Sequence, residues 1–224
     1  MRSHEFLMRR RLPLVRIGVG CWLASAWPTI GSGRVGETQG AIESRLLAAN
    51  VGKRLPVEPD DKDPTGRGRN NEPPFLAVAR FFPGDCHVER YWKSAVAHQL
   101  HRSDGWEIVV VFAGGVSVLE TYRRVGSGMS EFEQNGLLNL HRGASRWVRV
   151  DGQEAEPSVL GFTLMREDGE IRAQRRGNWF TLFATKLDTF ALARQAEARE
   201  LAERDREAQR KIDAERAPES IAGF

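Results

Sequence analysis

The sequence predicts an α+β fold, in which an antiparallel sheet carries one short packed helix and a long charged C-terminal helix. Three observations lead to this fold class. Three β-favouring runs separated by tight turns occupy the middle of the chain, a helix-capping box follows them, and a long stretch rich in Ala, Glu and Arg ends the sequence. Closely spaced strand and turn signals favour an antiparallel arrangement, and an uninterrupted run of strong helix formers favours a long helix.

The middle of the chain predicts an antiparallel meander of three strands. The strands are Ser94–Arg102, Trp106–Phe112 and Val116–Arg123, and the turns between them are Ser103–Gly105 and Ala113–Gly115. The second run is apolar at odd and even positions alike, so we expect this strand to be central and covered on both faces. Its residues divide between the faces as Trp106, Ile108, Val110 and Phe112 on one and Val109 and Val111 on the other.

A short helix is predicted directly after the meander. Ser130 and Glu133 have the spacing of a capping box, in which the serine side chain accepts from a backbone N–H and the glutamate reaches back to the cap. Leucines continue the helical pattern as far as Leu140, and Gly143 marks its end.

Several short strands are predicted between this helix and the C-terminal stretch. Arg146–Val150 has the pattern of a single strand. Val159–Arg166 and Glu170–Arg175 are predicted to form a second hairpin around the turn Glu167-Asp168-Gly169, and Asn178–Ala184 extends it.

Leu187–Glu215 is predicted to be a long helix. Glu200 precedes Arg204 by four residues, the better orientation for an intrahelical ion pair. Charged residues occupy the heptad positions between the sparse apolar ones, so a sustained coiled coil is not expected. We expect the helix to dock by its first turns and then project into solvent, where it could contact another envelope protein. The residues that could form an apolar stripe are Leu187, Phe190, Leu201 and Ile212.

The N-terminus has the order of regions of an export signal. Arg9–Arg11 form a basic patch, Ile17–Leu23 is a short apolar run, and Ala24-Ser25-Ala26 is the small-x-small pattern that signal peptidase cleaves. About ten apolar residues are too few for a helix that spans a bilayer, so we expect no transmembrane span after cleavage. The predicted product is an exported protein, periplasmic or secreted, that begins at Trp27.

Three alternatives for this leader stay open. Met8 directly precedes the arginines and is a second possible start. Arg10–Leu14 resembles a twin-arginine signal, although Pro13 is unfavourable there. Cys21 is a potential lipidation site, but Gly18 stands where a lipobox has leucine or a similar residue.

The sequence between the leader and the predicted core contains a short helix and a long loop, and these divide the chain into four segments. Pro56–Pro74 collects Pro, Gly, Asp, Asn and Arg, which predicts a long exposed loop. Ala41–Asn50 before it has helical apolar spacing, with Val51-Gly52 as a C-cap. The segments are a signal peptide at 1–26, a flexible N-terminal region at 27–74 with one short helix at 41–50, an α+β core at 75–185, and a long polar helix and tail at 186–224.

Charge argues against a nucleic-acid-binding protein, and cysteine content argues against a fold stabilised by intrachain disulfides. The leader holds five of the 33 basic residues and one of the 30 acidic residues, which leaves 28 basic and 29 acidic residues. A nearly neutral chain without a Lys/Arg block offers no counterion release to drive nucleic-acid binding. Cleavage also leaves Cys86 as the sole cysteine, so no intrachain disulfide can form.

The predicted elements carry an ordered set of motifs. A strand begins with Trp106, a turn contains Gly115, a strand ends in Glu120-Thr121-Tyr122, a helix ends near Leu137-Leu138, and Trp147 lies just beyond. With the turn at Arg166–Gly169 and the terminal Gly223-Phe224, this order resembles a group of small exported bacterial proteins of unknown function. The resemblance covers Ala41–Phe224 and implies no catalytic residue. The opening helix and hairpin are also similar to the small α/β module of outer-membrane assembly lipoproteins, with Pro56–Pro74 inserted.

No catalytic, cofactor-binding or metal-ligating set stands out in the sequence. Gly31–Gly36 matches G-x-G-x-x-G, but a cleavage site rather than a strand precedes it, which disfavours dinucleotide binding. Cys86 and His87 could be a nucleophile and a base, yet neighbours on an extended chain point to opposite faces. More distant partners for the thiol are His98 and His141. The histidines that follow the leader, which lack zinc-type spacing, are His87, His98, His101 and His141.

The aromatic residues fall into two groups. Trp106, Trp147 and Trp179 open strands and are expected in the core. Tyr91-Trp92-Lys93 is predicted to mark an exposed contact surface. The two remaining tryptophans are Trp22 and Trp27.

Together these features predict an exported, non-catalytic protein that acts by protein contact in the cell envelope. The expected partner is another envelope protein bound through the C-terminal helix, and no cofactor or metal is expected. The alternative is a small exported hydrolase or redox protein that uses Cys86. No motif identifies the substrate, the partner or the oligomeric state.

Overall fold

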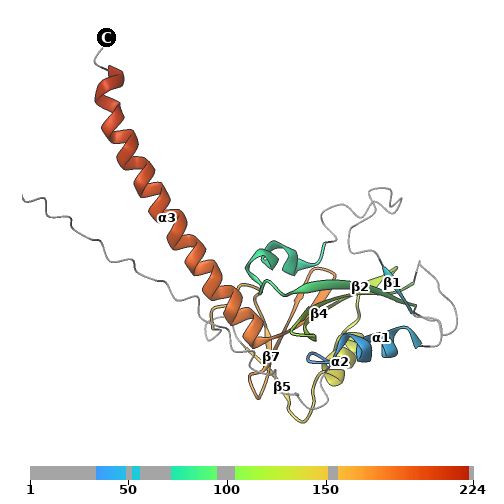
Figure 1. The fold of residues 1–224 in the computed structure, drawn as a ribbon. Helices are drawn as coiled ribbons and strands as arrows, with labels where there is room; N and C mark the ends of the chain where they lie inside the picture. The colour runs from blue at the N-terminus through green and yellow to red at the C-terminus, as the bar shows by residue number, and fades with distance from the viewer. Residues whose placement is uncertain (1–33, 49–51, 56–71, 95–103, 151–155, 222–224) are drawn as a thin grey trace, which may run out of the picture.

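The computed structural model describes residues 34–48, 52–55, 72–94, 104–150 and 156–221. The described residues form one antiparallel sheet with helices on both of its faces (Figure 1), which confirms the predicted α+β fold. The strands are β1 (Gly52–Leu55), β2 (His87–Ser94), β3 (Gly105–Ala113), β4 (Val116–Val125), β5 (Trp147–Arg149), β6 (Leu164–Arg166), β7 (Ile171–Arg176) and β8 (Trp179–Ala184). The helices are α1 (Gln39–Leu46), the 3₁₀ helices η3 (Pro74–Ala77) and η4 (Ala79–Phe81), α2 (Glu131–Leu140) and α3 (Thr185–Ile221).

The sheet consists of two meanders joined along one strand pair. Its order is β1-β2-β3-β4-β8-β7-β6-β5, so β1 to β4 and β5 to β8 are each neighbours in sequence order. The meanders meet where Leu119–Arg123 of β4 pair with Trp179–Phe183 of β8. The hairpins β3–β4 and β6–β7 and the extension by β8 confirm the predicted pairing, although β6 begins at Leu164 and not at the predicted Val159.

The first strand of the predicted meander was placed wrongly. The strand that pairs with β3 is His87–Ser94, with His87 opposite Phe112 and Ser94 opposite Gly105. Of the predicted strand Ser94–Arg102, residues 95–102 lie outside the described part of the chain. β2 has charged residues on both faces, so its sequence lacks the simple alternation of a half-buried strand.

Gly105 belongs to β3 rather than to the predicted turn. A side chain at this position would lie 2.6 Å from the Lys93 carbonyl oxygen and 2.7 Å from the Trp92 indole. The close approach of β2 therefore requires glycine here.

The two faces of the sheet are covered by different elements. The register places Ile108, Val110 and Tyr122 on the face that packs against α1 and α2. Val109 and Val111 lie on the other face, where η3, η4 and the first turns of α3 pack. Figure 1 shows these helices on opposite sides of the sheet. All five residues are buried, which confirms that β3 is central and covered on both faces.

Tyr91 and Trp92 are core residues, which corrects the predicted contact surface at 91–93. Tyr91 is fully buried and Trp92 is 3 % exposed. Because successive side chains of a strand point to opposite faces, one ring enters each half of the core. Only a strand covered on both faces can bury two neighbouring aromatic side chains.

The described part of 27–74 belongs to the same core, where the sequence analysis assigned a flexible region. Val35, Ile42 and Leu46 are buried in the main hydrophobic cluster. α1 confirms the predicted short helix, with Thr38 as its N-cap. Gly52 is the first residue of β1 and not a helix C-cap, since β1 pairs with β2.

α2 and α3 each begin with a defined polar contact. The predicted capping box is confirmed, since Glu133 N–H donates to Ser130 Oγ at 3.2 Å and Ser130 N–H donates to Glu133 Oε2 at 2.9 Å. In the first turn of α3, Asp188 is fully buried and forms an ion pair of 2.7 Å with Arg172. No helix within the described residues is long and apolar enough to cross a membrane.

Candidate functional site

The outer part of α3 is a long stretch of exposed helix within the described part of the chain. Leu187, Asp188 and Ala191 are buried at the base of the helix. Residues 196–215 are all exposed apart from the half-buried Ala202. Twenty residues of α-helix span roughly 30 Å, and Figure 1 shows this length of α3 extending away from the sheet.

Charged side chains of α3 pair with each other along the helix. Arg194 and Glu197 are 3.0 Å apart, and Glu200 and Arg204 are 3.7 Å apart, as predicted. Two large apolar side chains interrupt this polar surface: Leu201 is 61 % exposed and Ile212 is 43 % exposed. They are eleven residues apart, close to three helical turns, so they lie on one side of the helix.

Cys86 lies in an environment that keeps its thiol protonated. The side chain is half-buried and unpaired with any other cysteine. Burial raises the pKa of the Cys86 thiol to about 11, and the Asp85 carboxylate contributes in the same direction. A nucleophilic cysteine needs the opposite surroundings, which lower the thiol pKa.

The contacts of the His87 ring are with residues other than Cys86. Its ring stacks on Phe112 with centroids 5.1 Å apart, and one ring nitrogen lies 3.4 Å from Gln39 Oε1. Of the two more distant partners suggested for the thiol, His98 lies outside the described residues, whereas His141 is fully buried and contacts Val35 and Tyr122 through its ring nitrogens.

The described structure brings Glu120, Tyr122 and His141 together in a buried polar cluster. Each of the three is at most 2 % exposed. Tyr122 Oη lies 3.2 Å from His141 Nε2 and donates to Glu120 Oε2. Ser117 Oγ is 3.2 Å from Glu120 Oε1. The cluster therefore links β4 to His141, the C-cap residue of α2.

This cluster also fixes the chain that precedes α1. Val35 N–H donates to His141 Nδ1 at 3.3 Å, and Gly36 N–H donates to Ser117 Oγ at 3.0 Å. Because Nδ1 accepts a hydrogen bond, the neutral imidazole carries its proton on Nε2, where it faces the Tyr122 hydroxyl. A doubly protonated imidazole cannot accept from Val35, so only neutral His141 keeps this contact.

Burial determines the protonation of the cluster. It lowers the pKa of His141 well below its usual range, and Arg34 and Arg45 lower it further. It raises the pKa of Glu120 and of Tyr122. The cluster is closed to solvent, so these groups hold the fold and offer no substrate access.

A second buried carboxylate, Glu107, lies on the opposite face of the sheet. It forms ion pairs with Arg90 of β2 and Arg123 of β4. Burial alone would raise the pKa of Glu107, but the two guanidinium groups lower it. Arg123 also lies 5.2 Å from the ring centre of Trp179. This row of side chains crosses four strands and binds β2 to β8.

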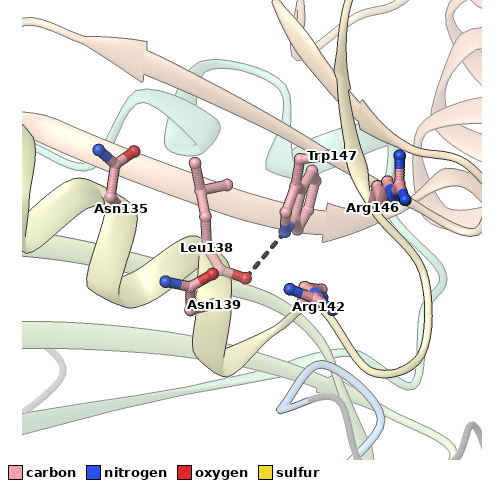
Figure 2. Close-up of a pocket in the computed structure, with 6 residues that line it drawn as sticks. All are labelled: Asn135, Leu138, Asn139, Arg142, Arg146 and Trp147. Carbon is pink, nitrogen blue, oxygen red and sulfur yellow. Dashed lines mark hydrogen bonds between the residues drawn. The ribbon is translucent and has the colours of Figure 1, made fainter.

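A shallow depression of about 400 Å³ lies between the end of α2 and the start of β5. Trp147 forms one wall, and its indole N–H donates to the Leu138 carbonyl oxygen at 2.8 Å, as Figure 2 shows. The polar side chains around it are exposed. The lining residues are Asn135, Leu138, Asn139, Arg142, Arg146 and Trp147.

The glycine motif at 31–36 is described only from residue 34 onward. Gly36 has a φ of 105°, and its N–H donates to the Ser117 carbonyl oxygen at 2.8 Å. That N–H is already used within the fold, so it is not directed at a phosphate.

Histidines and other possible metal ligands do not gather in the described residues. His87 is exposed and His141 is buried, whereas His101 lies outside the described part, like His98. No group of three or more His, Cys, Asp or Glu side chains suited to a metal ion occurs among the described residues.

The expected core tryptophans differ in their burial. Trp179 is 3 % exposed, whereas Trp106 and Trp147 are half-buried and pack against the core cluster. Trp22 and Trp27 lie outside the described residues.

Sequence reasoning missed the buried cluster and the depression beside Trp147. A signal for the first was available: Glu120 and Tyr122 are two residues apart in a strand, so they share one face with apolar neighbours. A carboxylate on such a face needs a partner. The depression had no sequence signal, because Asn135 and Trp147 meet only through the packing of α2 on β5.

Comparison of the chain with protein-family models, with curated proteins and with solved structures gives no match, so its function has to be inferred from its own residues.

Proposed function

We propose that this chain is an exported, non-catalytic protein that acts in the cell envelope by contact with another protein, and that the outer part of α3 carries the contact. The observation on which the proposal rests is a helix of 37 residues whose base is buried, whereas residues 196–215 are exposed apart from the half-buried Ala202. A folded domain does not need the remaining length for its own core.

The sequence supports the location. A basic patch, a short apolar run and a small-x-small site occur in the order of an export signal. The chain that remains after cleavage at Ala26 is nearly neutral, which does not favour nucleic acid as its partner.

The composition of the outer helix supports a protein partner. Interspersed charges of both signs keep an exposed helix soluble and helical. Leu201 and Ile212 add exposed apolar area on one side of it. Apolar side chains framed by polar ones are typical of protein contact surfaces.

The alternative, a hydrolase or redox protein that uses Cys86, has less support. A thiol with a pKa of about 11 is almost fully protonated at neutral pH, and the thiolate is the reactive form. Replacement of Cys86 by Ala separates the hypotheses. The contact hypothesis expects unchanged partner binding, whereas loss of a thiol-dependent turnover would establish the alternative.

Site-specific photo-crosslinking in cells tests the contact. A photoreactive residue at position 201 or 212 is expected to yield the same crosslinked partner. The matched control is position 76, because Leu76 is also a large exposed apolar residue, on η3. Crosslinks that are equally strong from position 76, or absent from both helix positions, would contradict the proposed role of α3.

Export has its own test. N-terminal sequencing of periplasmic or secreted material is expected to begin at Trp27. A cytoplasmic chain that retains Arg9–Arg11 would refute export, and the contact through α3 would then have to be sought in the cytoplasm.

A further inference from the structure

β5 is the edge strand at one end of the sheet in the described part of the chain, and two of its three residues direct their backbone polar groups outward. The Arg146 carbonyl oxygen accepts from the Glu167 N–H at 2.9 Å, and the Val150 N–H donates to the Thr163 carbonyl oxygen at 3.0 Å. In an antiparallel ladder the residues bonded to the neighbouring strand alternate with residues whose N–H and C=O point away. The backbone of Trp147 and Arg149 therefore points away from β6, and no backbone partner for it is found among the described residues.

Three arginines surround this open edge. Arg142, Arg146 and Arg149 are exposed, and among the described residues none of their guanidinium groups forms an ion pair, although the backbone N–H of Arg146 donates to Glu167 Oε2 at 3.4 Å. The buried arginines differ from these three, since Arg123 and Arg172 each form an ion pair with a carboxylate. The edge thus carries positive charge that the described part of the molecule does not neutralise.

The depression beside β5 is preformed. Trp147 is oriented by its hydrogen bond to the Leu138 carbonyl oxygen, and Asn139 and the two arginines at 142 and 146 surround the opening (Figure 2). Side chains alternate along a strand, so Trp147 and Arg149 lie on the α2 side of the sheet together with the depression. A volume of about 400 Å³ accommodates one or two side chains of a bound segment.

We propose that the free edge of β5 binds an extended acidic peptide segment of another protein by strand addition. The peptide backbone pairs with the outward N–H and C=O groups of Trp147 and Arg149. Acidic side chains at alternate positions of the peptide then point to the α2 side, where Arg149 shares their face and Arg142 and Arg146 line the depression beside Trp147. This surface is separate from α3, and the inference depends neither on export nor on the proposed role of that helix.

Arginine at an edge strand also has a simpler role, since charge on an edge discourages sheet-to-sheet aggregation. That role does not require an oriented tryptophan and a depression beside the strand. It also predicts no affinity for a particular peptide, so the two explanations can be separated by a binding measurement.

The test is the fluorescence anisotropy of a labelled six-residue peptide that alternates glutamate with valine, titrated with the purified full chain. We expect saturable binding that is lost when lysine replaces glutamate in the peptide. Arg146→Glu should weaken binding by about fivefold or more, because it replaces an attractive charge by a repulsive one. Arg176→Glu is the matched control, since it makes the same charge change at an exposed arginine of β7, and it should leave binding unchanged.

Two variants isolate the backbone contribution. Arg149→Ala keeps the outward N–H, whereas Arg149→Pro removes it without removing a bond to β6. The proline variant should bind roughly threefold or more weakly than the alanine variant, and both should keep the circular dichroism spectrum of the parent chain. Absence of binding by the acidic peptide would overturn the proposal. Equal affinity of the alanine and proline variants would overturn strand addition, since only an electrostatic attraction would then remain.

Discussion

Two polar parts of the chain, residues 34–46 and the outer part of α3, are held in opposite ways. In the first, Val35 and Gly36 donate backbone hydrogen bonds to the buried side chains of His141 and Ser117. In the second, Glu200 pairs with Arg204 of the same helix, in solvent. The difference lies in where the partners are: the N-terminal contacts cross to other elements inside the fold, and the helix contacts do not leave the helix.

The comparison shows that burial, not the number of polar contacts, decides how firmly a segment is held. An unsatisfied polar group costs about 1–3 kcal/mol once it is buried. An exposed ion pair contributes about 0–1 kcal/mol, because water and salt compete for both charges. Residues 34–46 are therefore expected to unfold with the sheet, and the outer part of α3 is expected to fray independently of it.

The largest expected effect on the free energy of unfolding is at Asp188, in the buried first turn of α3. It accepts from the Val159 N–H at 3.0 Å and from the Leu160 N–H at 3.2 Å and pairs with Arg172. Asp188→Ala leaves the buried Arg172 guanidinium with the exposed Glu156 as its remaining carboxylate partner and leaves two N–H groups without their acceptor, so the free energy of unfolding should fall by about 3 kcal/mol in urea denaturation. Asp205→Ala, the same change in the exposed helix, should alter it by less than about 0.5 kcal/mol. Equal effects at both positions would remove the distinction.

The pH dependence of stability tests the contact between Val35 and His141. The pKa of His141 is lowered in the folded state, so its contribution to the free energy of unfolding is full above its ordinary value of 6.5 and is lost as the pH falls. Asn at position 141 can accept from the Val35 N–H through its amide oxygen but cannot take up a proton. His141→Asn should therefore flatten the decline between about pH 7 and pH 5, which one group can make as steep as about 1.4 kcal/mol per pH unit.

Glu120 contributes with the opposite sign. Its pKa is raised in the folded state, so its contribution is full below its ordinary value of 4.5 and is lost as the pH rises through the folded value. The His141 effect is therefore best measured as the difference between parent and variant at each pH. His87→Asn is the control, since His87 lies at the surface. An unchanged slope in His141→Asn would show that this contact does not titrate in the proposed way.

Sequence patterns within a single element predicted the strands and helices in which each face meets either the core or solvent. β3, β4, β7 and β8 follow from the two-residue period, and α2 follows from its capping box. β2 was missed because its charged residues are neutralised by other strands: Glu89 by Arg54 of β1, and Arg90 by Glu107 of β3. A pattern within one strand contains no information about these partners.

The candidate sites depend even more on contacts distant in the sequence. Glu120 and Tyr122 are neighbours on one strand face, but His141 joins them from the end of α2 and Val35 joins from another segment 106 residues away. The exposed length of α3, in contrast, was predictable, since a helix with few apolar residues cannot be buried along its whole length.

A smaller effect on stability is expected when the same substitution, Ala→Gly, is made in the buried and in the exposed part of α3. Ala191→Gly and Ala198→Gly cost about the same in helix propensity, roughly 1 kcal/mol. Ala191 is fully buried beside the sheet, so its change should lower the free energy of global unfolding by at least that amount. Ala198 is exposed, so its change should reduce the helical circular dichroism signal and leave the unfolding midpoint unchanged. A similar shift of the midpoint in both variants would show that α3 unfolds as one unit with the core.

The smallest expected effect on stability is that of removing the chain after Glu203. The removed part has Ile212, Ile221 and Phe224 as its only large apolar residues. Burial of apolar surface stabilises by roughly 25 cal/mol per Å², and every residue from 203 to 215 is exposed. The truncated chain should therefore keep its melting temperature to within about 2 °C. Crosslinking from position 201 should nevertheless be lost if the contact surface continues along the helix to Ile212. A fall of about 10 °C or more would mean that the outer helix is part of the core, and the contact hypothesis would then lose its principal surface.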